Sequence, residues 1–311
     1  MLASAGPRKY LSLHRSKKLR DAATEVILNC GSGVRLQGFY SPADASSGSA
    51  AESPATGPGK KLVILIHGWL GGETSSYLLS AAAALYAQGY SVFRLNLRDH
   101  GNSQHLNKEL FHSARLDEVV EAMAQIQSLH PYKEFYLGGN FALRIAAHYD
   151  KATTRFDKIA AICPVVDPVN AMQTITDAMW VYPWYFVKRW KTTLAAKLLH
   201  FPALGFQREL KAARTLQDLN AFFVPKHTPY NELNDYFNAY AVTGQRLAKV
   251  DVATHIIHSA DDPVVSAGDL QKLAPSDNLT IEVTQYGGHC GFLKNFKMDT
   301  WVDDRLLELF N

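Results

Sequence analysis

The run Lys61–Ile66 reads KLVILI, and every residue after the first is aliphatic. A strand with one face in water alternates apolar and polar residues, so an unbroken aliphatic run predicts a strand buried on both faces. Such strands belong to parallel sheets, whose connecting helices cover both faces. The run therefore predicts an α/β protein, and a glycine-rich turn at residues 67–72 follows it directly.

Strand and helix signals alternate along most of the chain. Besides the run at 61–66, short apolar runs predict strands at 25–28, 36–40, 91–97, 134–137, 159–163, 254–258 and 279–283. Helical spacing of apolar residues predicts helices at about 75–88, 116–126 and 299–309. The first two strands are separated by Cys30–Gly33, which predicts a hairpin. Alternating strands and helices imply an α/β fold with a mostly parallel, doubly wound sheet.

Residues 164–250 break this alternation, because they contain helix patterns and aromatic clusters but no strand signal. The densest cluster begins with WVYPWYF at 180–186, and the segment Trp180–Trp190 predicts either the wall of an apolar pocket or the packing of inserted helices against one another. We interpret the segment as a helical lid. The chain then divides into a basic N-terminal arm (1–24), a core in two parts (25–163 and 251–311) and the lid (164–250).

The bulk composition argues against several classes of protein. The net charge is only +3, and the sequence contains no basic stripe of the kind that binds nucleic acid. No apolar run reaches the roughly 18 residues that a membrane span requires. Three scattered cysteines and the lack of a secretory signal favour a cytoplasmic location. Neither a nucleotide-binding glycine motif nor metal-ligand spacing occurs, so we expect no cofactor and no metal. The basic cluster between Arg8 and Arg20 indicates a solvated arm, with contact to an anionic membrane surface as the alternative.

The stretch Glu134–Ala146 predicts a short strand, a glycine turn and the first turns of a helix. Hydrolytic enzymes place a serine nucleophile on such a strand-to-helix turn, in the pattern G-x-S-x-G. Here the pattern is Gly138-Gly139-Asn140-Phe141-Ala142, with an amide at its centre. An amide has no nucleophilic oxygen to activate, so Asn140 marks the nucleophile position without being a competent nucleophile.

The turn that begins at His67 predicts a site for a developing negative charge. It follows a buried strand and precedes a helix, which is where hydrolases aim a backbone N–H at an oxyanion. The candidate N–H groups are those of Trp69 and of Phe141, the residue after the nucleophile position. The alternative is a glycine-rich turn with a purely structural role.

Two further loops contain a candidate acid and a candidate base. Asp262 follows the strand at 254–258 and could hold an imidazole in its correct tautomer, with Asp261 as the second choice. His289 lies between glycines in the loop after the last predicted strand, where it could act as a general base. The order of nucleophile turn, acid and histidine along the chain is the order that α/β-hydrolases use.

Taken together, these segments resemble the YheT-like branch of the α/β-hydrolases. The resemblance is carried by His67-Gly68-Trp69, Asn96–Ser103, Leu143–Ala147, Asp261-Asp262-Pro263 and Gly287–Phe292. It implies a carboxylic-ester hydrolase with a Ser-His-Asp triad, acting on acyl esters, with a helical lid between the sixth and seventh strands. By the same resemblance, Asp262 and His289 match the acid and the base, and Trp69 matches the oxyanion turn.

The chain departs from the family at the nucleophile, where members have a pattern like G-F-S-L-G-G-N. Either Asn140 replaces the serine of a normal elbow, or a Phe-Ser-Leu-Gly-Gly unit is missing between two glycine pairs; the second account fits the letters around it better. We therefore expect ester turnover that is lost or very low. The alternatives are a binding protein for an acyl or other apolar ligand, and a hydrolase with an unconventional nucleophile.

Overall fold

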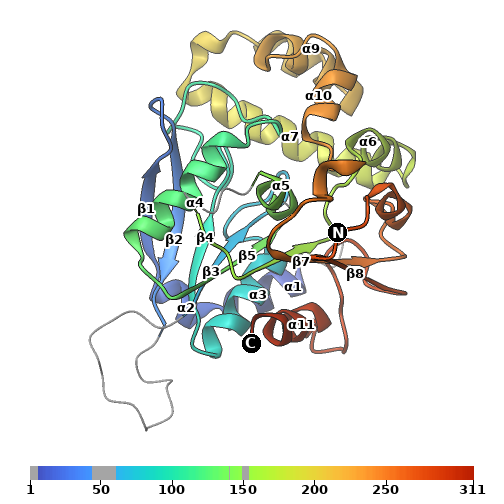
Figure 1. Cartoon of the computed structure of the whole chain (residues 1–311). Helices are drawn as coiled ribbons and strands as arrows, with labels where there is room; N and C mark the ends of the chain where they lie inside the picture. The colour runs from blue at the N-terminus through green and yellow to red at the C-terminus, as the bar shows by residue number, and fades with distance from the viewer. Residues whose placement is uncertain (1–5, 44–60, 140, 149–153) are drawn as a thin grey trace, which may run out of the picture.

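The computed structural model describes residues 6–43, 61–139, 141–148 and 154–311, and within them an eight-stranded sheet forms the centre of the molecule (Figure 1). The strand order is β1-β2-β4-β3-β5-β6-β7-β8. The strands are Thr24–Asn29 (β1), Arg35–Ser41 (β2), Lys61–Ile66 (β3), Ser91–Leu95 (β4), Glu134–Gly139 (β5), Lys158–Ile162 (β6), Ala253–Ser259 (β7) and Leu279–Thr284 (β8). β1, β2 and β4 pair antiparallel, and all other neighbours pair parallel. The predicted α/β fold with a mostly parallel sheet is confirmed.

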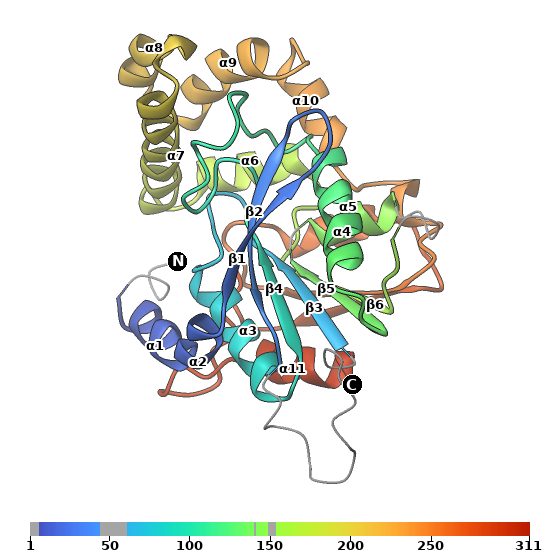
Figure 2. The ribbon, with the colours of Figure 1, turned by 90° about the vertical axis from the view of Figure 1, so that its left-hand side faces the viewer.

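Helices cover both faces of this sheet, as Figure 2 shows from the side. One face packs against α3 (Ser76–Ala87) and α11 (Trp301–Phe310). The other packs against α4 (Asp117–Leu129) and the short helix α5 (Ala142–Ala147). β3 is buried along its length beyond Lys61, as its unbroken aliphatic sequence predicts. The two apolar layers are therefore separate cores that share the sheet between them.

Residues 7–21 pack against the core rather than forming a free arm, although Lys9, Arg15, Lys17 and Lys18 are solvent-exposed, as the sequence indicates. They form α1 (Pro7–Arg15) and α2 (Lys17–Asp21), and α1 packs against α3. Leu19 joins the core beneath α3, and the buried Arg8 donates a hydrogen bond to the carbonyl oxygen of Cys290. The sequence of this segment is rich in basic residues, but the few apolar side chains between them determine how it packs against α3.

The segment between β6 and β7 is helical, as its sequence predicts, and we call its five α-helices the cap. They are α6 (Pro168–Asp177), α7 (Val181–His200), α8 (Gln207–Ala212), α9 (Leu216–His227) and α10 (Leu233–Tyr240). Short 3-10 helices lie at Pro202–Leu204, Gln245–Leu247 and Ala267–Lys272. The cap lies at one end of the sheet, at the top of Figures 1 and 2, and has its own apolar core. Among the described helices, none is both long and apolar enough to cross a membrane.

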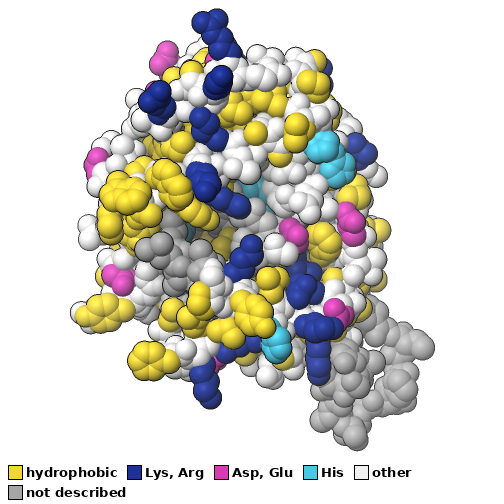
Figure 3. All heavy atoms as spheres, turned by 180° about the vertical axis from the view of Figure 1, so that it is seen from behind, with side chains coloured by type: hydrophobic (Ala, Val, Ile, Leu, Met, Phe, Trp, Pro, Cys, Tyr) yellow, Lys and Arg dark blue, Asp and Glu magenta, His cyan; other side chains and the backbone are white. Residues whose placement is uncertain are grey.

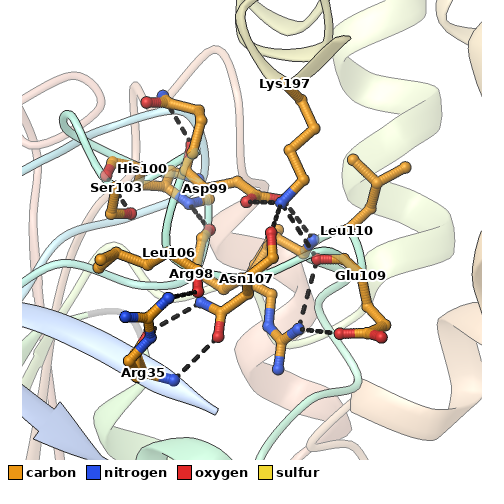
Figure 4. A network of polar contacts seen from close by, with 12 residues as sticks. Arg35, Arg98, Asp99, His100, Ser103, Leu106, Asn107, Glu109, Leu110 and Lys197 are labelled. Atoms are coloured by element: carbon orange, nitrogen blue, oxygen red, sulfur yellow. Dashed lines mark hydrogen bonds and ion pairs between the residues drawn. The ribbon is translucent and has the colours of Figure 1, made fainter. Parts of the chain in front are cut away.

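A buried ion pair ties the cap to the core. Lys197 of α7 has a fully buried side chain, and its Nζ lies 2.7 Å from Oδ1 of Asp99 in the loop after β4. The same amine donates to the carbonyl oxygens of Asn107 and Glu109, as Figure 4 shows. The other oxygen of Asp99 accepts the N–H of Phe111. Each donor of the amine and both oxygens of the carboxylate thus have a partner.

Candidate functional site

The loops that follow the parallel strands meet at one edge of the sheet. β3 leads to Trp69, β7 leads to Asp262 and β8 leads to His289. Because the carboxyl ends of parallel strands lie at the same edge, residues that are distant in the sequence come together there. Asn140, the expected nucleophile position after β5, lies outside the described residues.

Asp262 and His289 are in direct contact. Oδ2 of Asp262 lies 2.9 Å from Nδ1 of His289. The other oxygen of this carboxylate accepts the backbone N–H groups of Val264 and Val265. The carboxylate is therefore fixed by its own loop and oriented toward the imidazole, which is the geometry that sets a histidine tautomer.

Asp261, the second choice for the acid, has a different role. Its Oδ1 accepts the backbone N–H groups of Gly287 and Gly288, at 2.9 and 2.7 Å. These glycines immediately precede His289. The two adjacent aspartates thus have different roles. Asp262 contacts the imidazole, and Asp261 holds the loop that presents it.

The surroundings of this pair favour its charged forms. Burial alone would lower the pKa of His289, but the neighbouring Cys290 thiolate and Asp262 outweigh burial and raise that pKa to about 9. Burial also opposes ionisation of Asp262, yet the hydrogen bond with His289 and two backbone N–H groups bring its pKa below the ordinary value. The result is a carboxylate next to an imidazole that retains its proton.

We expect the His289 imidazole to titrate near pH 9 rather than at the ordinary value of 6.5. Because the folded-state pKa is the higher one, protonation of His289 stabilises the fold fully below pH 6.5, and this contribution is lost as the pH rises through 9. Asp262→Asn should lower the pKa of His289, since it removes the facing carboxylate. NMR titration of the imidazole C–H signals measures both values, and an unchanged His289 pKa in Asp262→Asn would contradict this account.

Two buried histidines shape the turn that contains Trp69. The ring of His67 accepts a backbone N–H from the loop after β4, and the ring of His100 accepts the N–H of Leu70. Burial lowers the pKa of His67 to about 3 and that of His100 to about 4, so both rings stay neutral and keep an acceptor nitrogen. Within the described residues, the N–H groups of Trp69 and Phe141 have no hydrogen-bond acceptor.

The end of β5 leaves no room for a side chain just before the expected nucleophile. Gly139 has a φ of +132°, and a Cβ added to it would lie 1.9 Å from the carbonyl oxygen of Ile66. Only glycine fits such a conformation and such a contact. Helix α5 begins at Ala142 and has only six residues, which is short for a helix that covers a sheet.

Two cysteines that sequence spacing did not single out lie beside the imidazole. Ligand atoms of Cys163, His289 and Cys290 all lie within 4.8 Å of one another, and those of Cys163, His258 and Asp262 do the same. Contact between the two thiols raises the pKa of Cys163 and lowers that of Cys290, which the protonated His289 also favours. Thiolates and imidazole are ligands that zinc prefers. Only the order of the strands could have predicted this cluster, because Cys163 directly follows β6 and so lies at the same edge of the sheet as His289.

The predicted site residues line two different cavities. A cavity of about 110 Å³ between the cap and the core is lined by both Trp69 and Phe141. His289 lines a second cavity of about 60 Å³, together with Gly138 and Cys290. Trp69 and Phe141 thus line one cavity and His289 lines the other, whereas Asp262, which contacts His289, lines neither of the two.

The aromatic cluster of the cap takes both of the roles that the sequence left open. Trp190 lines the larger cavity and also packs against Phe223 of α9, with ring centroids 5.4 Å apart, whereas Phe186 packs on Trp69 of the core at 5.6 Å. Trp180 and Trp184 are exposed instead. Figure 3 shows hydrophobic side chains gathered beside a hollow on the back face of the molecule.

Comparison with known proteins concerns the fold of this chain. A family model described as the alpha/beta hydrolase fold matches residues 61–296. An esterase of Pyrococcus furiosus is similar in structure, with a TM-score of 0.56, 15% identity, and coverage of 92% of this chain and 89% of the esterase. The 2,6-dihydroxy-pseudo-oxynicotine hydrolase has a TM-score of 0.56 at 13% identity, covering 93% of this chain and 67% of the hydrolase.

A protein of unknown function from Staphylococcus aureus has a TM-score of 0.55 at 14% identity, with coverage of 93% of this chain and 98% of that one. At these identities the structural likenesses concern the fold alone. No curated protein matches the sequence.

Proposed function

Because the chain belongs to the α/β-hydrolase fold family, we propose that it is an esterase-like member whose own ester turnover is lost or very low. Its motifs favour the YheT-like branch of the family. We propose that the cap acts as a lid over the cavity of about 110 Å³, which holds an acyl ester or another apolar ligand. In the part of the chain that the structure describes, no disulfide joins its three cysteines, which supports a cytoplasmic location.

One observation supports this proposal most strongly. The acid–base contact between Asp262 and His289 is present, whereas residues 137–142 contain no serine, cysteine or aspartate. In a complete triad the histidine takes the proton of the serine hydroxyl as that oxygen attacks the ester carbonyl. Two backbone N–H groups, here proposed to be those of Trp69 and Phe141, would then stabilise the oxyanion. Without the hydroxyl, His289 has no proton to remove and no covalent intermediate can form at this position.

The unmodified protein should hydrolyse short and medium p-nitrophenyl esters no faster than its His289→Ala variant. Both proteins retain the backbone N–H groups and the cavity. They differ only in His289, which has no serine hydroxyl from which to take a proton. The measurement is the initial rate with equal amounts of the two proteins. A rate in the unmodified protein well above that of His289→Ala would overturn the loss of turnover.

Ligand binding is tested separately, by displacement of a fluorescent fatty acid. Saturable displacement by unlabelled acyl compounds is expected, since the walls of the larger cavity are mostly apolar and aromatic. A probe that binds without saturation, or not at all, would remove the binding half of the proposal.

A second candidate function rests on the thiols beside the imidazole. Cys290 follows His289 directly, and its thiol pKa is lowered by contact with Cys163 and by the imidazole, so it could attack an ester as a thiolate. Any turnover of this origin should disappear in Cys290→Ala and persist in Cys30→Ala, a matched change at another buried free cysteine. Equal residual rates in the two variants would exclude a thiol nucleophile at Cys290.

A further inference from the structure

The larger cavity has a buried cation in its wall. Arg144 of α5 lines this cavity and is only 8% exposed. Its guanidinium donates to the carbonyl oxygen of Ser113 and lies over the rings of Phe141 and Tyr240, at 4.7 and 5.8 Å from their centroids. Among the described residues it has no carboxylate partner. A buried arginine is ordinarily paired with an anion, because a desolvated charge is costly when it stands alone.

Other polar groups of the same wall are also short of partners. His112 is 6% exposed, and its Nδ1 has no hydrogen-bond partner among the described residues. Asn220 is 3% exposed, and the one hydrogen-bond partner of its side-chain amide in the described part of the chain is the sulfur of Met172, at 4.0 Å. A thioether is a weak acceptor. The wall therefore combines a buried cation with an amide and an imidazole that can bind a polar group.

Among the described residues that line this wall, Arg144 is the one with a full charge. Burial, together with Arg115, Arg98 and Arg144, lowers the pKa of His112 to about 3, so the imidazole ring stays neutral. None of the described residues that line the cavity is acidic. An anion entering from water would meet attraction here and no carboxylate to repel it.

The remainder of the cavity is apolar, and its size limits the ligand. Trp190, Phe223 and Phe237 are among the aromatic side chains of its walls. An apolar cavity of about 150 Å³ accommodates benzene. The cavity of about 110 Å³ is smaller than that, so it accommodates the carboxyl end and first carbons of an aliphatic chain, and the rest of a longer chain requires the cap to move as a lid.

From these observations we infer that the cavity binds a small monocarboxylate, with its carboxylate on Arg144 and its hydrocarbon part against the aromatic walls. The inference rests on the proposed function and specifies its ligand as the free acid rather than the ester. A guanidinium offers two parallel N–H groups to a carboxylate, a match that a neutral ester cannot reproduce. The Asn220 amide can donate to the same ligand, since its present acceptor is weak.

Isothermal titration with hexanoate and with hexanamide tests this inference, because the two probes share shape and chain length and differ in charge. We expect hexanoate to bind the unmodified protein about tenfold tighter or more, as a charge-assisted hydrogen bond predicts. In Arg144→Gln this preference should disappear, while the affinity for hexanamide changes less than about twofold. Arg208→Gln, a matched change on the exposed surface of α8, should leave the preference intact.

Arg144→Lys guards against a variant that merely fails to fold, since it keeps the charge and should keep part of the preference. Equal affinities of the unmodified protein for hexanoate and hexanamide would overturn the inference, as would a preference that survives in Arg144→Gln. Neither result touches the proposed function, which is decided by the displacement of the fluorescent fatty acid. Absence of hexanoate binding alongside saturable fatty-acid displacement would likewise refute only the small-carboxylate assignment.

Discussion

Insertion of Phe-Ser-Leu-Gly-Gly after Gly139 is expected to raise p-nitrophenyl ester hydrolysis by about 1,000-fold or more over the unmodified chain. The reason is that the nucleophile is missing while its proposed supports remain. Asp262 contacts the imidazole of His289, and the N–H groups of Trp69 and Phe141 have no acceptor among the described residues. Triad members act as a unit, so restoring the missing one should recover most of the rate at once.

The measurement compares four proteins at equal concentration. They are the unmodified chain, the insertion, the same insertion with alanine in place of serine, and Asn140→Ser. Rescue by the insertion alone supports a lost elbow unit, whereas rescue by Asn140→Ser supports a simple substitution. Rates that stay low in every variant would contradict the assignment of Asp262 and His289 as acid and base.

Lys197→Met is expected to lower the free energy of unfolding by about 3–5 kcal/mol. Burial lowers the pKa of Lys197 and raises that of Asp99, and in each case the opposite charge works against burial. The pair is therefore held by the fit of its hydrogen bonds rather than by a large net attraction. Removing the amine leaves the carboxylate of Asp99 buried without its partner, which is the costly case.

Urea unfolding followed by circular dichroism measures this effect. Lys188→Met, on the exposed side of the same helix, should change stability by less than about 0.5 kcal/mol. Adding Asp99→Asn to Lys197→Met should recover much of the loss, since no charge is then left behind. Asparagine suits this position because Asp99 has a φ of +60°, which asparagine tolerates. A single Lys197→Met variant as stable as the unmodified protein would show that the pair does not anchor the cap.

The parts of the molecule that the sequence predicted well are those that depend on local pattern. The aliphatic run at 61–66 predicts a central buried strand because a strand buried on both faces needs an apolar side chain at every consecutive position. The segment 164–250 predicts helices because it lacks strand signals. The approach of Asp262 to His289 followed from strand order, since both lie in loops at the carboxyl edge of the sheet.

The parts that the sequence did not predict depend on long-range packing. Lys197 and Asp99 are 98 positions apart, and a lysine on a helix ordinarily indicates a solvated face. Arg144 likewise has the appearance of a surface residue until the cap is placed over it. Cys163 and Cys290 are separated in the sequence by the whole cap and by β7 and β8, so their contact could be inferred only from the strand order.

The burial of Lys197 has a practical consequence for following the cap in solution. Reagents that acylate lysines require a solvent-exposed, unprotonated amine, and the Lys197 amine is fully enclosed and bonded to Asp99. Lys197 would therefore be labelled only after α7 separates from the loop after β4. Lys188 on the same helix is exposed and would be labelled whether or not the cap opens. The extent of Lys197 labelling relative to Lys188 labelling, followed over time by peptide mapping, therefore measures how often the cap opens. The measurement needs no engineered probe.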